Sequence, residues 1–401
     1  MRSVASRVGV MNGEGALAVF ARARELEREG HSIIHLELGE PDFHPAPEVQ
    51  HALRTALAEG RDRYTAAGGV PALQQAIADY LNQTRDLDID AGNVVVAPGC
   101  KPALGLVMQA IIENGDEVLC PQPSFPIYPS LTRALGGTPV MFGLRETNGF
   151  QPDPDEIACK ISRRTKLLIV NSPNNPTGTV LNEDARRAIV DFALQHDLLV
   201  ISDEIYARVI YGQSYVSLAS YPGMLERTAI VDGFSKSFAM TGWRLGYAVA
   251  PDWMVPAMHM LVVNSFTCVA EFVQYAAIEA LRDRSGACPR MVGTFAERRE
   301  RFLKRLNQIP GFRSSLPDGA FYAWVNVAGT GASAEELCRL MLEQAGVAAI
   351  PGAAFGELGK DFVRFSFANS MEKLDEAADR ILALSSTWAK AGTHELLGRR
   401  R

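Results

Sequence analysis

The chain has 401 residues, of which 47% are hydrophobic and 21% charged, a composition typical of a globular protein with a large buried core. Its formal net charge of −6 argues against a broad nucleic-acid or membrane-surface role, because either role needs a basic face. Six cysteines without a CxxC pair argue against a zinc or redox motif. No apolar run reaches the length of a signal-peptide core or a membrane span, so we expect a cytoplasmic protein.

Up to about residue 250, the chain alternates amphipathic helices with short apolar runs. Helical spacing predicts helices over 15–30 and 71–81 and, further on, over 183–196. His31 and His35 lie in a strand-like segment without a third ligand nearby, so we expect no metal site there. The short apolar runs predict strands at 94–97, 116–120, 136–142, 167–170, 198–202, 229–233 and 245–250. Such alternation favours a mostly parallel sheet covered on both faces, with functional loops after the strands.

The pattern changes past about residue 285. A charged helix is expected over 294–308, followed by GAFYAWVNV, a helix over 333–345, GVAAIPG and VRFSFAN. Short apolar segments mixed with helices in this order favour a smaller α+β domain.

Four polar features stand where predicted strands end. APGCKPAL (97–104) joins a strand to a helix through a glycine turn, and amide groups at such a helix start bind phosphate, although an ordinary turn has the same pattern. NSPNNPTG (171–178) is constrained by two prolines and can hold an asparagine rigidly. SDEIY (202–206) places Asp203 at a strand end, where it needs a partner or caps a helix. VDGFSKSFAMTGWRLGY (231–247) holds Lys236 and Arg244, each of which alone is typical of a solvated surface charge.

Taken together, the four features match the needs of one cofactor, pyridoxal 5′-phosphate. Its phosphate needs amide groups and cations, and its pyridine nitrogen needs a carboxylate to stay protonated. Its ring oxygen needs hydrogen-bond donors, and its aldehyde needs a lysine amine to form a Schiff base.

At this level the sequence resembles the fold-type I pyridoxal-phosphate enzymes, and specifically the class I and II aminotransferases of the aspartate aminotransferase branch. NNPTG, SDEIY and SKSFAMTGWRLGY occur in the family's order and spacing, and the resemblance runs from about residue 15 to 385. It implies that Lys236 is the covalent anchor and proton shuttle, and that Asp203 partners the pyridine nitrogen. Asn175 and Tyr206 would donate to the ring oxygen, and Phe125 would stack on the ring.

The resemblance also implies how the phosphate is bound. Arg244 matches the family's phosphate-binding arginine, and Gly99, Cys100 and Lys101 match its phosphate loop, with Cys100 offering its backbone. Tyr64, in DRYTAAGG, matches a tyrosine that reaches the phosphate of the neighbouring subunit.

One position departs from the family's pattern. Many relatives have Ser or Thr three residues before the lysine, in contact with the phosphate, whereas this chain has Gly233. Lys101 and Ser235 are candidates to compensate for the missing hydroxyl.

For the substrate, the resemblance implies that Arg364, in FVRFSFA, holds the α-carboxylate bidentately and that the Gly39 backbone, in LGEPDF, approaches the same group. No equivalent is evident of the arginine that selects aspartate-type side chains. Four residues are expected near the side-chain pocket: Met11, Asn12, Glu14 and Thr267. Glu14 raises the hypothesis of a cationic substrate.

The expected architecture has a large cofactor domain over 46–289, with a mixed, mostly parallel seven-stranded sheet. The small α+β domain combines 1–45 with 290–401, and two subunits of a homodimer share each active site. The expected reaction moves an amino group between an L-amino acid and a 2-oxo acid. Lys236 then needs a lowered pKa, which we expect from Arg244, the phosphate environment and partial burial.

Two other functions fit parts of the pattern. The same cofactor residues serve lyases, cyclases and oxidases of amino acids in secondary metabolism, which release a different product. A cofactor-binding transcription regulator has this fold after a winged-helix domain. We do not expect that function here, because the pattern begins within about thirty residues of the first residue.

Overall fold

The computed structural model describes residues 4–11, 13 and 15–398. Its centre is a seven-stranded sheet, in which the strand order is β2-β8-β7-β6-β5-β3-β4. Strand β8 is antiparallel to both of its neighbours and the other pairs are parallel. The strands are β2 (Val94–Ala97), β3 (Glu117–Gln122), β4 (Thr138–Gly143), β5 (Thr165–Asn171), β6 (Leu199–Asp203), β7 (Thr228–Gly233) and β8 (Gly246–Val249). The seven predicted strands and the mostly parallel sheet are confirmed.

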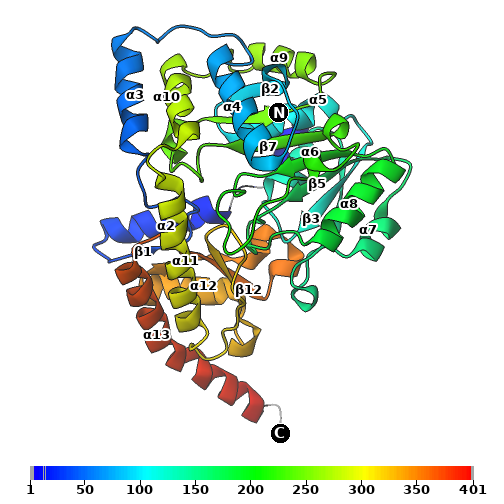
Figure 1. The fold of residues 1–401 in the computed structure, drawn as a ribbon. Helices are drawn as coiled ribbons and strands as arrows, with labels where there is room; N and C mark the ends of the chain where they lie inside the picture. Colours follow the sequence, from blue (N-terminus) through cyan, green and yellow to red (C-terminus); the bar gives the residue numbers. More distant parts are fainter. Residues whose placement is uncertain (1–3, 12, 14, 399–401) are drawn as a thin grey trace.

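Helices cover this sheet on both faces, because alternate residues of each strand point to opposite sides. In β2, Val95 and Ala97 pack with α5 (Cys100–Ile111) and α9 (Val255–Val263), and α6 (Ile127–Ala134) lies on the same face. Val94 and Val96 pack on the opposite face with α4 (Pro71–Arg85) and α10 (Glu271–Arg282). That face also carries α7 (Pro154–Lys160) and α8 (Glu183–Gln195), while α3 (Pro47–Ala58) lies beside α10 (Figure 1).

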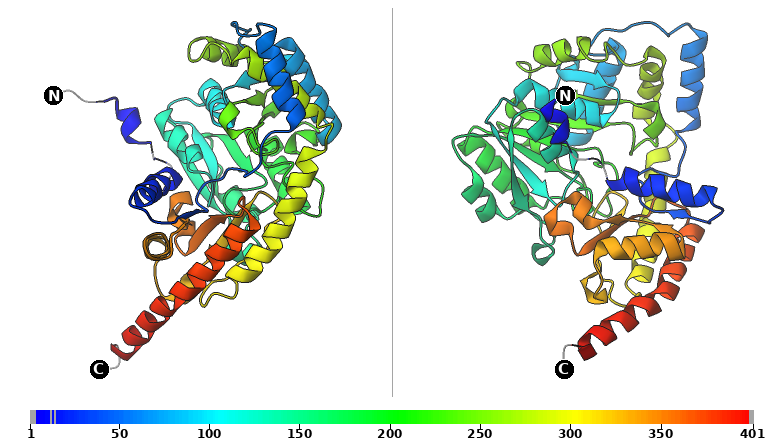
Figure 2. Two further views of the ribbon diagram at one scale, coloured as in Figure 1. Left: turned by 90° about the vertical axis from the view of Figure 1, so that its left-hand side faces the viewer. Right: turned by 180° about the vertical axis from the view of Figure 1, so that it is seen from behind.

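The remaining strands form two small sheets. Strands β9 (Tyr322–Asn326), β11 (Ile350–Pro351) and β12 (Phe362–Ser366) make an antiparallel sheet, and β1 (Ile34–His35) pairs with β10 (Val347–Ala348). Around them lie α2 (Gly15–Arg28), α11 (Ala287–Leu306), α12 (Ala334–Ala345) and α13 (Met371–Gly398). Figure 2 shows α11 running from the large sheet to this region and α13 beside it, extending beyond the body of the molecule. The domain boundaries at 46 and 289 stay a prediction.

The predicted functional loops meet at one edge of the large sheet. Asn171 and Asp203 are the last residues of the neighbouring strands β5 and β6, where they stand side by side, and Gly233 ends β7. Because parallel strands end at the same edge, these residues face one region. Within the described part of the chain, no helix is long and apolar enough to cross a membrane.

Candidate active site

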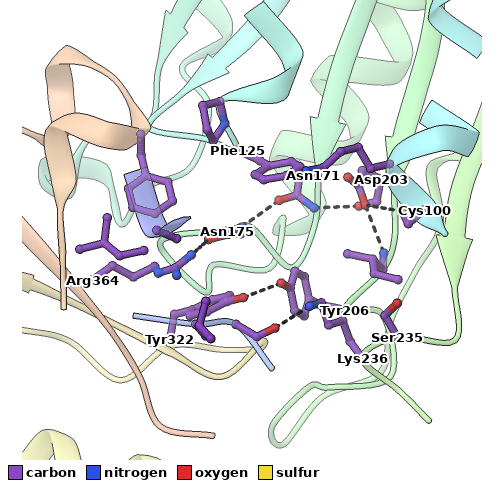
Figure 3. Close-up of a pocket in the computed structure, with 18 of the residues that line it drawn as sticks. Cys100, Phe125, Asn171, Asn175, Asp203, Tyr206, Ser235, Lys236, Tyr322 and Arg364 are labelled. Carbon is purple, nitrogen blue, oxygen red and sulfur yellow. Dashed lines mark hydrogen bonds between the residues drawn. The ribbon is translucent and has the colours of Figure 1, made fainter. Parts of the chain in front are cut away.

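A cavity of about 270 Å³ lies where the carboxyl ends of the large sheet face β11 and β12. Eleven of the thirteen residues predicted for the site line this cavity, whereas Gly99 adjoins it and Tyr64 does not (Figure 3). The eleven are Gly39, Cys100, Lys101, Phe125, Asn175, Asp203, Tyr206, Ser235, Lys236, Arg244 and Arg364. Segments that are more than 300 residues apart in the sequence therefore form one pocket.

Lys236 is the cavity's partly buried amine. It follows β7 in a loop, and its Nζ donates a hydrogen bond to the carbonyl oxygen of Gly39. Burial lowers its pKa to about 8, and the positive charges of Arg364 and Arg244 act in the same direction, whereas Glu40 opposes them. Burial and Arg244 thus lower the pKa as expected, with burial as the largest cause, and the contribution of the phosphate environment stays a prediction.

Asp203 is the buried carboxylate at the end of β6, with 5% of its surface exposed. The Tyr128 hydroxyl donates to its Oδ2 at 2.7 Å, and the backbone amide of Ile205 donates to its Oδ1 at 3.3 Å. Burial raises the pKa of Asp203 to about 6, although both hydrogen bonds act in the opposite direction. A cation placed beside this carboxylate would favour its charged form.

Arg364 and Asn175 meet on the side of the small sheets. Nη1 of Arg364 donates to Asn175 Oδ1 at 2.9 Å, and Nη2 donates to the carbonyl oxygen of Glu37 at 2.6 Å. Asn171 fixes the asparagine, because its side chain accepts from the Asn175 amide at 2.8 Å and donates to the Asp203 carbonyl at 3.0 Å. The NNPTG loop is thus tied to both the carboxylate strand and the arginine.

Tyr322 on β9 is a pocket residue that sequence reasoning missed. Its hydroxyl lies 2.7 Å from the hydroxyl of Tyr206, and its ring lies 4.3 Å from the guanidinium carbon of Arg364. A Cβ at Gly39 would come within 2.0 Å of the same hydroxyl, so this position excludes any side chain. Tyr128, in the first turn of α6, was missed as well, and its ring packs edge-on against that of Phe125 at 5.9 Å between centroids.

Gly99 and Arg244 form a tight corner at the start of α5. Gly99 has a φ of +110°, and a Cβ there would lie 2.6 Å from Arg244 Nη2, so only glycine fits. The guanidinium also donates to the Thr241 carbonyl at 2.9 Å. Helix α5 begins at Cys100, so its free amide groups and the guanidinium are adjacent. The Cys100 thiol lies 4.0 Å from Asp203 Oδ1.

The structure gives a physical reason for Gly233. Gly233 of β7 pairs with Gly246 of β8, and a Cβ at Gly233 would lie 2.8 Å from the Gly246 Cα. A Cβ at Gly246 would in turn lie 2.5 Å from the Cys100 amide nitrogen. Two facing glycines therefore allow β7, β8 and the start of α5 to pack closely.

Two of the four residues expected around the substrate side chain can be located in the structure, and neither lines the cavity. Met11 and Thr267 are exposed and do not line the cavity, and Asn12 and Glu14 lie outside the described residues. Apolar residues that do line the cavity come from the start of α2 (Gly15 to Leu17) and include Leu38, Ile350, Ala354 and Phe355.

Tyr64 is 87% exposed in the single chain. Its predicted contact with a neighbouring subunit stays a prediction.

Comparison with known proteins identifies the family. The model of the class I and II aminotransferases matches residues 31–381. An aspartate aminotransferase of Pyrococcus horikoshii is 39% identical over 382 residues, which are 94% of this chain and 96% of that protein. The chain belongs to the class I and II aminotransferases. The resemblance stated from the motifs is thereby confirmed.

Other aminotransferases support this assignment. An aromatic-amino-acid aminotransferase of Thermococcus litoralis is 37% identical, with 94% of this chain and 97% of that protein covered. The structure of an aspartate aminotransferase from Thermus thermophilus with maleate superposes with a TM-score of 0.91, at 35% identity over 96% of this chain and all of that one. These aminotransferases do not favour the lyase, cyclase or oxidase alternative.

Proposed function

We propose that this aminotransferase uses pyridoxal 5′-phosphate, held in the cavity by the residues predicted from the sequence. The observation that carries the proposal is one cavity that contains a low-pKa lysine, a buried carboxylate and a cationic corner at a helix start. The donors and charges of the cavity match those the cofactor needs. When bound, the cofactor accepts the electron pair released at the substrate's α-carbon.

The corner formed by Gly99 and Arg244 would hold the phosphate. Amide groups at the first turn of α5 and the guanidinium supply donors and positive charge without any rearrangement of the backbone. Lys101 and the Ser235 hydroxyl line the same cavity and add a second charge and a hydroxyl donor. A side chain at position 233 would clash with β8. Ser235 and Lys101 would therefore make the phosphate contacts that a Ser or Thr at this position makes in many relatives.

Asp203 would face the pyridine nitrogen and keep it protonated. Its charged form, which burial disfavours, becomes favourable once a cationic ring nitrogen is its partner. Asn175 and Tyr206 would donate to the ring oxygen, and Phe125 would pack on the ring face.

Lys236 would be the covalent attachment point and then the base. Its lowered pKa leaves a larger neutral fraction near pH 7, which both roles need. Arg364 would bind the substrate α-carboxylate, with the backbone at Gly39 beside it. The freed amine of Lys236 would then take the proton from the substrate α-carbon and deliver it to C4′ of the cofactor.

The substrates would be an L-amino acid and a 2-oxo acid, and two relatives are named for aspartate and for aromatic amino acids. A homodimer would place Tyr64 of each subunit at the other's phosphate. The hypothesis that Glu14 selects a cationic side chain stays open. It fails if Glu14→Gln leaves the preference for basic over neutral amino acids unchanged.

A half-reaction screen tests the proposal. The enzyme purified with its cofactor is mixed with one amino acid at a time, and the 2-oxo acid and pyridoxamine phosphate formed are measured by mass spectrometry. At least one amino acid should give both products in equal amounts, without release of ammonia. Failure of every amino acid would refute transamination. Retention of a covalently bound cofactor by Lys236→Ala, after borohydride reduction, would refute the assignment of the lysine.

A further inference from the structure

A buried cluster of charged residues lies at the ends of β6 and β7, and none of its members belongs to the predicted site. It consists of Arg85, Glu204 and Asp232, hereafter the Arg85 cluster, and their exposed fractions are 5%, 0% and 4%. Nη1 of Arg85 contacts Glu204 Oε2, and Nη2 contacts Asp232 Oδ2. One guanidinium therefore bridges two buried carboxylates.

Hydroxyl groups complete the hydrogen bonding of both carboxylates. Ser202 and Ser217 donate to Glu204 Oε1 at 2.8 and 2.7 Å. The Tyr247 hydroxyl donates to Asp232 Oδ2 at 3.2 Å. A buried ion group of this kind adds little stability over apolar residues of the same volume, because desolvation offsets the attraction. Its presence therefore calls for another role.

The position of the cluster in the chain indicates that role. Glu204 directly follows Asp203, and Asp232 precedes Lys236 by four residues. Oδ1 of Asp232 also accepts from the Gly233 amide at 2.6 Å, at the end of β7. Arg85 is the last residue of α4, so the guanidinium ties one helix end to the two strand ends that carry the carboxylate and the lysine.

We propose that Arg85 is a positioning residue, which bridges Glu204 and Asp232 so that the ends of β6 and β7 hold Asp203 and Lys236 toward the same cavity. The inference rests on the proposed function of those two residues. The bridge needs the planar fork of arginine, because a lysine ammonium supplies the charge but cannot contact two carboxylates in the same fixed geometry.

Electrostatics also links the cluster to Asp203. The negative charges of Asp232 and Glu204 raise the pKa of Asp203, in addition to the larger effect of burial. Asp203 also interacts with the Tyr128 hydroxyl from α6, the Cys100 thiol from α5, the Ile205 amide and the Tyr206 side chain. Arg85 offsets the two cluster carboxylates in part, so they disfavour the charged form of Asp203 less than two unpaired carboxylates would.

The first test compares Arg85→Lys with Arg305→Lys. Arg305 also contacts two carboxylates, Asp375 and Asp379, but it lies on α11 at the surface, so it is a matched control. We expect kcat of Arg85→Lys to fall by about ten- to a hundred-fold with KM nearly unchanged, because a small misplacement of reacting groups has this effect. Arg305→Lys should keep the wild-type kcat. A folded Arg85→Lys enzyme with kcat within twofold of wild type would overturn the proposal.

The second test works on the cofactor-free protein, so it remains informative if Arg85→Lys does not fold. The titration of Asp203 is followed by carbon-13 NMR of the aspartate carboxylates and assigned with Asp203→Asn. In Asp232→Asn, loss of a neighbouring negative charge should lower the pKa of Asp203 from about 6. An unchanged pKa would overturn the link between cluster and site. This result is independent of transamination, which the half-reaction screen tests separately.

Discussion

The pKa of Lys236 makes a quantitative prediction for the cofactor-free protein. At pH 7 an amine with a pKa of about 8 is neutral in about 10% of molecules, against about 0.03% for an ordinary lysine with a pKa of 10.5. The fold thus increases the fraction of neutral amine at pH 7 about 300-fold. A pKa near the working pH is what a general base requires. We expect the reactivity of Lys236 toward an amine reagent to rise with pH around a midpoint near 8.

Competitive acetylation with peptide mass spectrometry measures this midpoint. Trace acetic anhydride is added to the cofactor-free protein at a series of pH values, and the peptide that contains Lys236 is compared with peptides of exposed lysines in the same digest. Because burial slows the reagent at every pH, the midpoint rather than the absolute rate is the measured quantity. A midpoint above about 10 for Lys236 would refute the reasoning, since burial would then not disfavour the ammonium.

Two variants separate the causes of this shift. Glu40 raises the pKa of Lys236, so Glu40→Gln should move the midpoint below that of the wild type. Arg364 lowers the same pKa, so Arg364→Met should move the midpoint upward. Shifts in the opposite directions would show that the neighbouring charges do not act on the amine as the geometry requires.

Four substitutions give further predictions. Asp203→Asn keeps a polar group of the same shape but no charge, and kcat should fall by about 100-fold or more; full activity would contradict the role of the carboxylate. Arg364→Lys keeps the charge but cannot bind the substrate carboxylate through two parallel hydrogen bonds, and KM should rise by roughly 10- to 100-fold at similar kcat. Tyr322→Phe removes only the hydroxyl near Tyr206, and kcat should fall by about 3- to 10-fold, whereas a wild-type rate would leave this contact without a catalytic effect. Gly233→Ser places a Cβ against the opposite strand and should destabilise the fold by about 1–3 kcal/mol, seen as a lower thermal midpoint.

The sequence predicted the large sheet because its strands carry a strong signal. Each is a short apolar run between turns, and each predicted run overlaps an observed strand, as at 94–97 for β2. The polar residues after these strands were found for a related reason, since parallel strands end at one edge of the sheet. Asp203, Lys236 and Asn175 could therefore be expected to meet before any contact was known.

Other site residues could not be found in this way. Tyr322 lies in a strand whose apolar neighbours indicate only a buried core, and it reaches the site because β9 faces the large sheet. Arg85 ends an ordinary amphipathic helix, where an arginine is typical of the exposed last turn. In both cases the decisive partners lie more than 100 residues away in the sequence. Local patterns carry no information about such pairs.

Three contacts join the large sheet to the residues that face it across the cavity: Lys236 with the Gly39 carbonyl, Asn175 with Arg364, and Tyr206 with Tyr322 (Figure 3). Each pairs a group proposed for the cofactor with one near the substrate carboxylate. A carboxylate bound bidentately by the Arg364 guanidinium would take up donors that now serve Asn175 and the Glu37 carbonyl. Nδ2 of Asn175 takes no part in the contact with Arg364, so this group would donate to the cofactor's ring oxygen whether or not the carboxylate is bound. Covalent attachment to the cofactor would end the hydrogen bond between Lys236 and the Gly39 carbonyl, and the amine would serve as a base only after the substrate frees it.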